Sequence, residues 1–312
     1  MQRSYNLTQY EAASKKRLKV STLLIFTIIP LTILIGIKFF NDRKYMIVSF
    51  LILLYTIIPF FMVFEKRKPK AREIVLIAMM SALTVTSSIF FNITIPIKAG
   101  TALIIISGIA LGPEAGFLVG SLSRVICNFY QGQGPWTPWQ MFCWGLLGFL
   151  AGVVFNKIDL NNKIKSRNFK VVIGPIVCIV FSIIVAYILF LLFPSGEKTF
   201  LGWRLYIFGF IGLILGLIIQ RKRLPIDDIT LSIFTLLSIF IIYGGIMNIC
   251  AMVTAANIPG NEISFSRLKA LYISGVPYDL AHAAGATIFM FLFGEKIIRK
   301  IERIKIKYGI YR

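Results

Sequence analysis

The chain has 312 residues, of which 57% are hydrophobic, 14% aromatic and 15% charged. Ordinary soluble domains contain about 45–50% apolar and about 25% charged residues, so this composition argues against a soluble fold. Lys and Arg number 34 against 13 Asp and Glu, a net charge of +21. Such an excess is typical of proteins that bind nucleic acid or an anionic membrane, and the positions of the charges distinguish the two.

Hydrophobic runs close to the ~20 residues that span a bilayer recur along the chain. The fourth run is too short to cross the bilayer as a straight helix, and because Gly112 and Pro113 follow it, we expect a partial span joined tightly to the fifth. The sequence therefore predicts an all-α polytopic membrane protein with about ten transmembrane helices, at residues 20–37, 46–64, 73–91, 100–112, 114–130, 138–155, 171–193, 203–219, 229–253 and 274–294.

The basic residues indicate the orientation of these spans. Ten spans place both termini on one side, and the loops and termini of that side carry 25 Lys and Arg against 7 in the opposite loops. Basic loops are retained in the cytoplasm, so we expect a multi-pass protein of the cell membrane with both termini cytoplasmic. The excess of basic residues is then explained by the orientation of the protein in the membrane and by contact with anionic lipid headgroups. Binding of nucleic acid is not needed to explain it.

Ionisable residues inside a membrane are costly, so each is a candidate for function. Arg124 lies in the middle of the fifth span and shares a helix face with Asn128, four residues on. Asp279 and His282 share a face of the tenth span. Arg124 either forms a buried ion pair with Asp279 or contacts an anionic or polar substrate. His282 is a proton relay, a ligand contact or a hydrogen bond between helices.

Other polar residues at membrane depth gather toward the outer side, which predicts an outward-facing pocket. The loop from Gln131 to Trp139 combines glycines, prolines and two tryptophans. Its tryptophans are either interfacial anchors or part of a flexible loop that closes over a small molecule, with hydrogen bonds from Gln131 and Gln133. Aromatic groups and few charges favour a planar, largely uncharged ligand. The candidate substrate-binding residues are Arg124, Asn128, Gln131, Gln133, Trp136, Trp139, Gln140, Asn248, Tyr278, Asp279 and His282.

The sequence contains no pattern typical of a metal site, a disulfide or a nucleotide-binding loop. Each of the four Cys lies alone in an apolar run, one His with one nearby Asp is too few for a metal, and no G-x-x-x-x-G-K-[ST] loop occurs. No nucleophile stands at an interpretable spacing from Asp279 and His282. We therefore expect no enzyme activity, no catalytic residues, no bound metal and no cofactor in this chain.

Two glycine-rich or small-residue patterns bear on helix packing. The spacing W-x5-G-x2-G-x3-G occurs at Trp139 and again 64 residues later at Trp203, which indicates either a duplicated hairpin or two similar packing faces. Ala78 and Ala82 have a small-x-x-x-small spacing that permits close contact with another helix. That partner helix is either internal or belongs to another membrane protein.

Four segments together resemble a known family. They are 65–73 (EKRKPKARE), 108–117 (GIALGPEAGF), 132–141 (GQGPWTPWQM) and 275–282 (GVPYDLAH), of which the third is the most specific. The chain resembles the substrate-binding (S) components of energy-coupling-factor (ECF) vitamin transporters, most strongly over residues 65–155 and 240–312.

The resemblance implies a six-helix membrane bundle that takes a vitamin or vitamin precursor from outside. Such a subunit docks on a transmembrane coupling protein with two cytoplasmic ATPases, which use the ATP, and topples in the membrane to release its cargo inward. Ala78 and Ala82 would face the coupling protein. The chain would then comprise an N-terminal extension of two helices (1–64) and an S-component-like domain (65–312) with a two-helix insertion at about 156–219.

Two further predictions concern the identity of the substrate and the mode of transport. Similar sequences suggest a cobalamin-related compound first and a queuosine-type base next. The alternative is a self-sufficient secondary transporter in which Asp279 and His282 carry protons. A membrane enzyme acting on lipid or isoprenoid is a weaker alternative.

Overall fold

The protein is described here by a computed structural model covering residues 16–40, 45–62, 71–94, 97–155, 169–193, 199–219, 223–256 and 262–310. Every one of the ten predicted spans is helical within these residues. Among the described residues, six helices are long and apolar enough to cross a membrane, and three further apolar helices are shorter. The expectation of an all-α polytopic membrane protein is confirmed.

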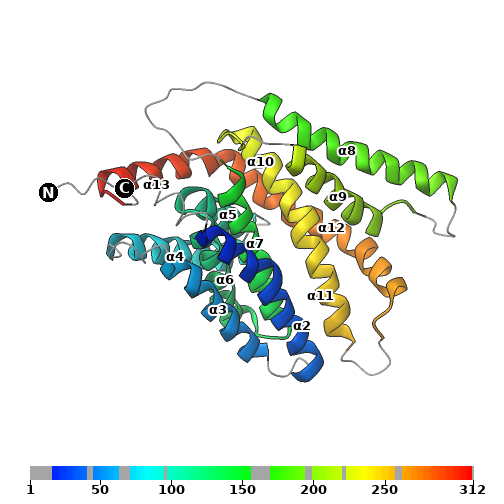
Figure 1. Cartoon of the computed structure of the whole chain (residues 1–312), viewed down its shortest axis with the longest axis horizontal. Helices are drawn as coiled ribbons and strands as arrows, with labels where there is room; N and C mark the ends of the chain where they lie inside the picture. Colours follow the sequence, from blue (N-terminus) through cyan, green and yellow to red (C-terminus); the bar gives the residue numbers. More distant parts are fainter. Residues whose placement is uncertain are drawn as a thin grey trace.

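Figure 1 shows the helices in their order along the chain. Several are interrupted by a π-helical turn, labelled η, without a break in the helix. Helical residues 16–23 lead into η1 (Leu24–Ile28) and α2 (Ile29–Phe40), followed by α3 (Tyr45–Met62), α4 (Ala71–Thr94), α5 (Ala99–Leu111), α6 (Pro113–Gln131), α7 (Trp136–Val154), α8 (Phe169–Leu192), α9 (Trp203–Ile219), α10 (Asp228–Leu237), η2 (Ser238–Gly244), α11 (Gly245–Ala255), α12 (Phe265–Phe289), η3 (Met290–Gly294) and α13 (Glu295–Lys307).

The short fourth span and its tight turn are confirmed. Helix α5 has 13 residues, which at ~1.5 Å per residue spans about 20 Å, less than the ~30 Å hydrocarbon core. Gly112 has a φ of 104°, a conformation that favours glycine, and Pro113 begins α6 directly after it. We call this end of the bundle the Gly112 end, and the end with the α6–α7 loop the Gly132 end.

Glycines allow α5, α6 and α7 to pack with their backbones almost in contact. A Cβ atom on Gly148 of α7 would lie 2.4 Å from the Gly116 carbonyl oxygen of α6, and one on Gly108 of α5 would lie 1.9 Å from the Gly148 oxygen. In the second copy of the tryptophan–glycine pattern, Gly212 and Gly216 of α9 meet the backbone of α8 in the same way. The repeat therefore marks two hairpins that pack through glycine, as small residues permit in lipid.

Six helices form the centre of the fold: α4, α5, α6, α7, α10 with α11, and α12 with α13. The N-terminal pair packs through α3 on α6 and α7, while α8 packs on α9, and α9 packs on η2 and α12. Figure 1 shows α8 and α9 along the upper right and α2 and α3 along the lower edge. The two pairs therefore cover different parts of the six-helix bundle.

The chain leaves and rejoins this bundle at one point. Phe155, directly after α7, and Leu224, shortly before α10, form a parallel bridge in which the Leu224 amide donates to the Val154 carbonyl at 2.9 Å. This geometry fits an insertion of α8 and α9 between two core helices. The predicted boundaries themselves, at 64/65 and 156, lie outside the described residues.

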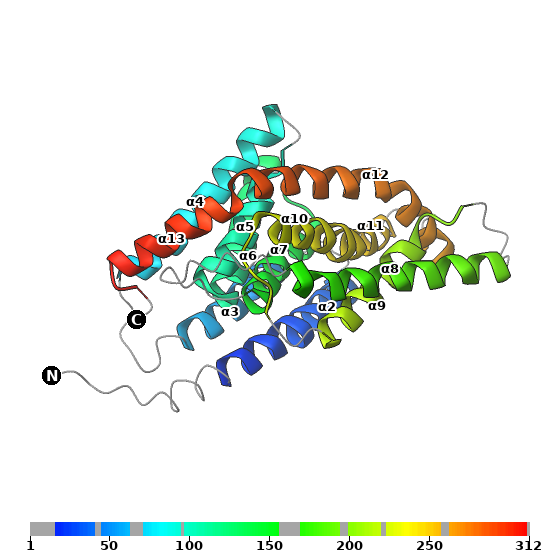
Figure 2. The same ribbon diagram turned by 90° about the horizontal axis from the view of Figure 1, so that it is seen from above.

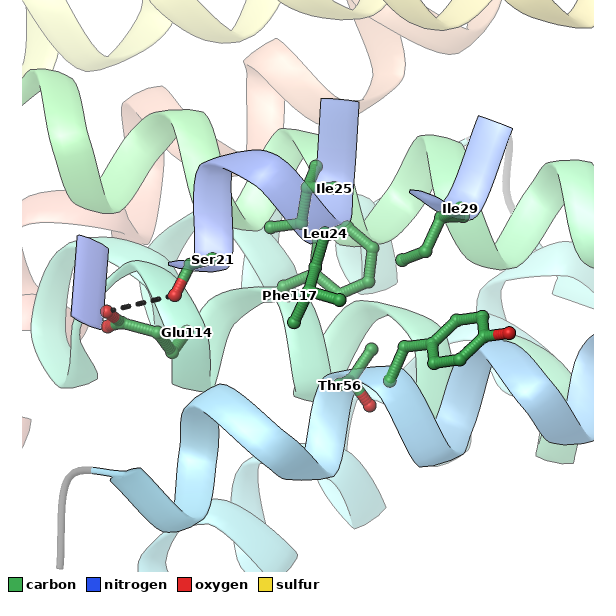
Figure 3. A pocket seen from close by; sticks show the side chains of 8 residues that line it. Ser21, Leu24, Ile25, Ile29, Thr56, Glu114 and Phe117 are labelled. Atoms are coloured by element: carbon green, nitrogen blue, oxygen red, sulfur yellow. Dashed lines mark hydrogen bonds between the residues drawn. The ribbon is translucent and has the colours of Figure 1, made fainter. Parts of the chain in front are cut away.

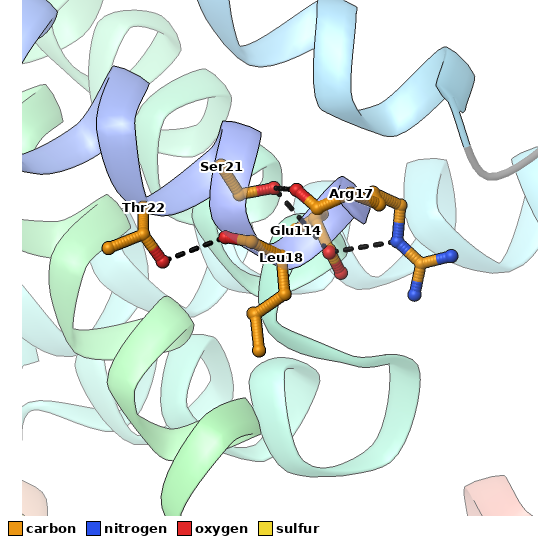
Figure 4. Close-up of polar contacts among 5 residues, drawn as sticks. All are labelled: Arg17, Leu18, Ser21, Thr22 and Glu114. Atoms are coloured by element: carbon orange, nitrogen blue, oxygen red, sulfur yellow. Dashed lines mark hydrogen bonds and ion pairs between the residues drawn. The ribbon is translucent and has the colours of Figure 1, made fainter. Parts of the chain in front are cut away.

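A buried carboxylate fastens the N-terminal helix to the bundle at the Gly112 end. Arg17 donates its Nε to Glu114 at 2.9 Å, and Ser21 approaches the same oxygen at 3.5 Å (Figure 4). Glu114 lies in the first turn of α6, where a negative charge is favoured by the helix dipole. Beside it is a small pocket between three helices (Figure 3), lined by Ser21, Leu24, Ile25, Ile29, Tyr55, Thr56, Glu114 and Phe117.

The last helix is longer than the predicted span of 274–294. It begins at Phe265 and continues through η3 to Lys307, so the basic segment after the span is helical and not a loop. Its apolar face buries Ile298 and Ile301, and α13 packs on α5. Lys305 donates to the Ala110 carbonyl at 2.7 Å, near the end of α5, where a positive charge is favoured. Figure 2 shows α13 continuing directly from α12.

Candidate functional site

Polar side chains on one face of α6 form a connected cluster near the Gly132 end. Arg124, Asn128 and Gln131 are spaced four and three residues apart, which places them on one helix face. The Arg124 Nε donates to the Asn128 Oδ1 at 2.9 Å, and its Nη2 donates to Asn128 and Gln131. Asn128 in turn donates to the Gln140 Oε1 at 2.9 Å and to the Thr137 Oγ1 at 3.0 Å. We call these five residues the amide cluster.

The α6–α7 loop is held by its own side chains. Gly132 has a φ of 104°, which ends α6. Gln133 donates to the Val125 carbonyl at 3.2 Å and accepts from the Thr137 hydroxyl at 2.9 Å. The Gly134 amide also donates to Thr137, at 3.2 Å. The amide nitrogen and oxygen of Gln133 are thus both hydrogen-bonded within this region. Gln131, in contrast, is exposed.

A second cluster of aromatic side chains surrounds His282. Its Nε2 lies 2.9 Å from the Thr101 Oγ1, which also accepts a hydrogen bond from the Trp144 Nε1 at 3.0 Å. The Tyr243 ring packs edge-on against both Trp144 and His282, with centroids 4.5 and 4.6 Å apart. Four residues from α5, α7, η2 and α12 therefore meet here, and we call them the aromatic cluster.

Arg124 joins the two clusters. Its guanidinium carbon lies 4.7 Å from the centroid of the Trp144 ring, the geometry of a cation–π contact. The amide cluster and the aromatic cluster are thus one continuous site. It offers a cation, amide groups and aromatic faces, which together suit a planar ligand with polar substituents.

Asp279 belongs to a different network. Its Oδ2 accepts from the Tyr206 hydroxyl at 2.5 Å and from the Asn248 Nδ2 at 2.9 Å. A Cβ atom on Gly244 would lie 2.6 Å from the Asp279 carboxyl carbon, so the glycine leaves space for this group. Asp279 and Arg124 have separate partners, and the ion pair weighed from the sequence is not formed.

The remaining predicted site residues lie away from this site. Trp139 is buried beside α2 and α3, in a pocket with Ile33 and Tyr45. Trp136 is 41% exposed and covers Gly134, and Tyr278 is 79% exposed. The structure therefore does not bring these three side chains together with the amide and aromatic clusters.

Several residues of the two networks were not predicted from the sequence. In the aromatic cluster, Thr101 and Trp144 are ordinary residues in apolar helices. In the Asp279 network, Tyr206 comes from α9, in the segment expected to be an insertion. Lys98 lies just before α5, and burial, followed by the charge of the Arg124 guanidinium, lowers the pKa of its ammonium group. The only sequence signal for Lys98 was that it is the one basic residue in its loop.

Comparisons with known proteins support the resemblance. Residues 68–201 match the model of the family described as ECF-type riboflavin transporter, S component. A relative described as a UPF0397 protein, from Aster yellows witches'-broom phytoplasma (strain AYWB), is 30% identical over 86 residues. That alignment covers 27% of this chain and 45% of the relative, so less than half of the relative is matched. No solved structure matches the chain. The resemblance to ECF S components is confirmed over the segment that begins before α4 and contains the amide cluster.

Proposed function

We propose that this chain is the substrate-binding membrane subunit of an ATP-driven ECF-type importer that captures a vitamin or vitamin precursor. The observation that carries the proposal is the family match over residues 68–201, which includes α6 and α7 and so the whole amide cluster. The description of the matched family names riboflavin as the transported solute. For this chain a cobalamin-related compound or a queuosine-type base remains a prediction.

In the proposed orientation, the Gly132 end faces outward and both termini are cytoplasmic. The distribution of 25 basic residues on one side and 7 on the other supports this orientation. Arg124 is seven residues before Gln131, which corresponds to about 10 Å along a helix. A solute entering from outside would therefore meet Gln131 before it reaches Arg124.

The proposed partners are a transmembrane coupling protein and two cytoplasmic ATPases. Ala78 and Ala82 are both exposed on α4, together with the large apolar side chains of Val75, Met79 and Leu83. Within the residues that the structure describes, α4 packs mainly on α5 and α6, so this exposed face offers a close-packing surface for a partner helix. It supports docking of the coupling protein here.

Co-purification tests the proposal. Tagged full-length protein should bring down a transmembrane coupling subunit and two ATPases, and uptake of its solute should require ATP hydrolysis. Leucine at both Ala78 and Ala82 should reduce that recovery, whereas Ala270→Leu, an equally exposed alanine on α12, should not. Consistent failure to recover any coupling subunit would overturn the importer proposal.

The alternative is a proton-coupled secondary transporter. The observation that favours it is that Asp279 and His282 share one face of α12. Uptake by the isolated protein in liposomes, driven by a proton gradient without ATP, would support it. The same liposomes should show no uptake if the chain is an importer subunit.

A further inference from the structure

Arg124 is a charged group at membrane depth whose partners are all neutral. The Asn128 and Gln131 amide oxygens accept its Nε and Nη2 hydrogens. The Trp144 ring covers one face. Within the described residues, its other terminal nitrogen, Nη1, has no hydrogen bond. A guanidinium held in this way is oriented but not neutralised, which is costly in a low-dielectric region.

The buried carboxylates of the described chain are committed elsewhere. Glu114 is at the Gly112 end, with Arg17. Glu73 is in the first turn of α4, at that same end. Asp279 accepts hydrogen bonds from Tyr206 and Asn248. The positive charge of Arg124 is therefore not balanced by an acidic side chain among the residues that the structure describes.

Lys98 adds a second positive charge to the same region. It precedes α5, and Thr101, one turn later, belongs to the aromatic cluster. Burial lowers the pKa of Lys98, and so does the nearby Arg124. An anion bound by Arg124 would therefore enter a region that carries more than one positive charge.

The exposure of these residues leaves a route for such an anion. Gln131 is exposed, while Lys98, Arg124 and Gln140 are partly exposed, all toward the Gly132 end. The amide cluster fixes the plane of the guanidinium, so Nη1 can donate without further ordering of the side chain. A guanidinium matches a carboxylate in shape and charge.

We propose that the solute bound by this chain carries a carboxylate that binds to Arg124, with its planar ring against Trp144 and Tyr243. This inference rests on the proposed function, because it names the substrate class of the same site. A single carboxylate fits the one available guanidinium edge. The proposal keeps the planar ring expected from the sequence and replaces the expectation of a largely uncharged ligand with an acid that carries one negative charge.

Small molecules retained by the protein test this proposal. Full-length wild-type protein, Arg124→Gln and Arg204→Gln are purified in parallel, and the polar and lipid extracts are analysed separately by mass spectrometry. Arg204 is a matched control because it is also a buried arginine stacked on aromatic rings, but it lies on α9. Wild type and Arg204→Gln should retain a carboxylic acid in the polar extract, and Arg124→Gln should lose it on the order of 10- to 100-fold, as expected for charge-assisted hydrogen bonds.

Two probes of similar shape, one charged and one neutral, test whether binding requires the negative charge. Benzoate should displace the retained acid from wild-type protein in the millimolar range, and benzamide, which is neutral, should not. Thermal unfolding of each variant checks that Arg124→Gln remains folded, and Arg124→Lys, which keeps the charge, should retain part of the binding.

The outcomes separate this inference from the proposed function. A neutral retained compound, or an acid that Arg124→Gln keeps as well as wild type does, would overturn the carboxylate site but leave a solute-binding subunit. An acid found only in the lipid extract would likewise overturn it in favour of a lipid site. Absence of any retained compound, together with no shift of the unfolding midpoint by benzoate, would overturn both the carboxylate site and the solute-binding function.

Discussion

The Tyr206 hydroxyl donates a hydrogen bond of 2.5 Å to the Asp279 carboxylate across 73 residues of sequence. The Tyr206 ring is stacked between Phe240 and Tyr272, with centroids 5.1 and 4.6 Å away. This contact joins α9 to the six-helix bundle, so the segment expected to be an insertion supplies a partner for an intramembrane acid.

Loss of this hydroxyl should destabilise the protein. Tyr206→Phe keeps the stacked ring but leaves the buried carboxylate with Asn248 as its remaining donor, and we expect a cost of about 1–3 kcal/mol. Thermal unfolding in detergent measures it as a lower midpoint. Tyr187→Phe on α8, where the tyrosine is 48% exposed, is the control and should change the midpoint little. Equal effects of the two substitutions would contradict the assigned role of the hydrogen bond.

Glycine at position 148 should be required for the packing of α6 on α7. In Gly148→Ala the new methyl group would meet the Gly116 backbone, so the helices must separate, at a cost of about 1–3 kcal/mol or more. Gly174→Ala in α8 is the matched control, since a Cβ atom there meets nothing within 4 Å and alanine favours a helix. The measurement is the yield of folded protein and its unfolding midpoint. A tolerated Gly148→Ala would show that the backbones are not in contact.

The Arg17–Glu114 pair should couple the N-terminal helix to the bundle. A double-mutant cycle with Arg17→Gln and Glu114→Gln should give a coupling free energy of about 1 kcal/mol or more, because the Glu114 side chain is 5% exposed. The exposed Arg299–Glu295 pair on α13 should give about 0.3–0.5 kcal/mol. A coupling near zero for Arg17 and Glu114 would mean that other contacts hold the helix.

Thr101 should matter to binding through two partners. Thr101→Val keeps the shape of the side chain but removes the oxygen shared by Trp144 and His282. We expect about 10-fold weaker retention of the bound solute with a smaller change in stability, because loss of a buried hydrogen-bond partner disturbs the aromatic cluster. Thr287→Val, near the C-terminal end of α12, is the control, since that hydroxyl donates only to the Ala283 carbonyl of its own helix. Unchanged retention in Thr101→Val would place the solute away from the aromatic cluster.

Part of the site could be predicted from the spacing of its residues. Helical spacing correctly placed Arg124 and Asn128 on one face, and Asn128 with Gln140 followed from their common membrane depth. Gln131 was expected in the loop, but it is the last residue of α6 and joins the same cluster. The role of Trp144 as the ring beneath Arg124 carried no such signal, because a tryptophan in an apolar helix looks the same whether it faces lipid, core or ligand.

The sequence by itself determined the helices of this protein and the tight turn at Gly112. These are local properties, since a segment in lipid must satisfy its backbone hydrogen bonds within itself. The tertiary structure decided which helix faces meet: Trp139 turns to the N-terminal pair, Asp279 to Tyr206, and Arg124 to Trp144. Such pairings depend on helix rotation and on contacts between segments far apart in the chain, which hydropathy and residue spacing do not encode.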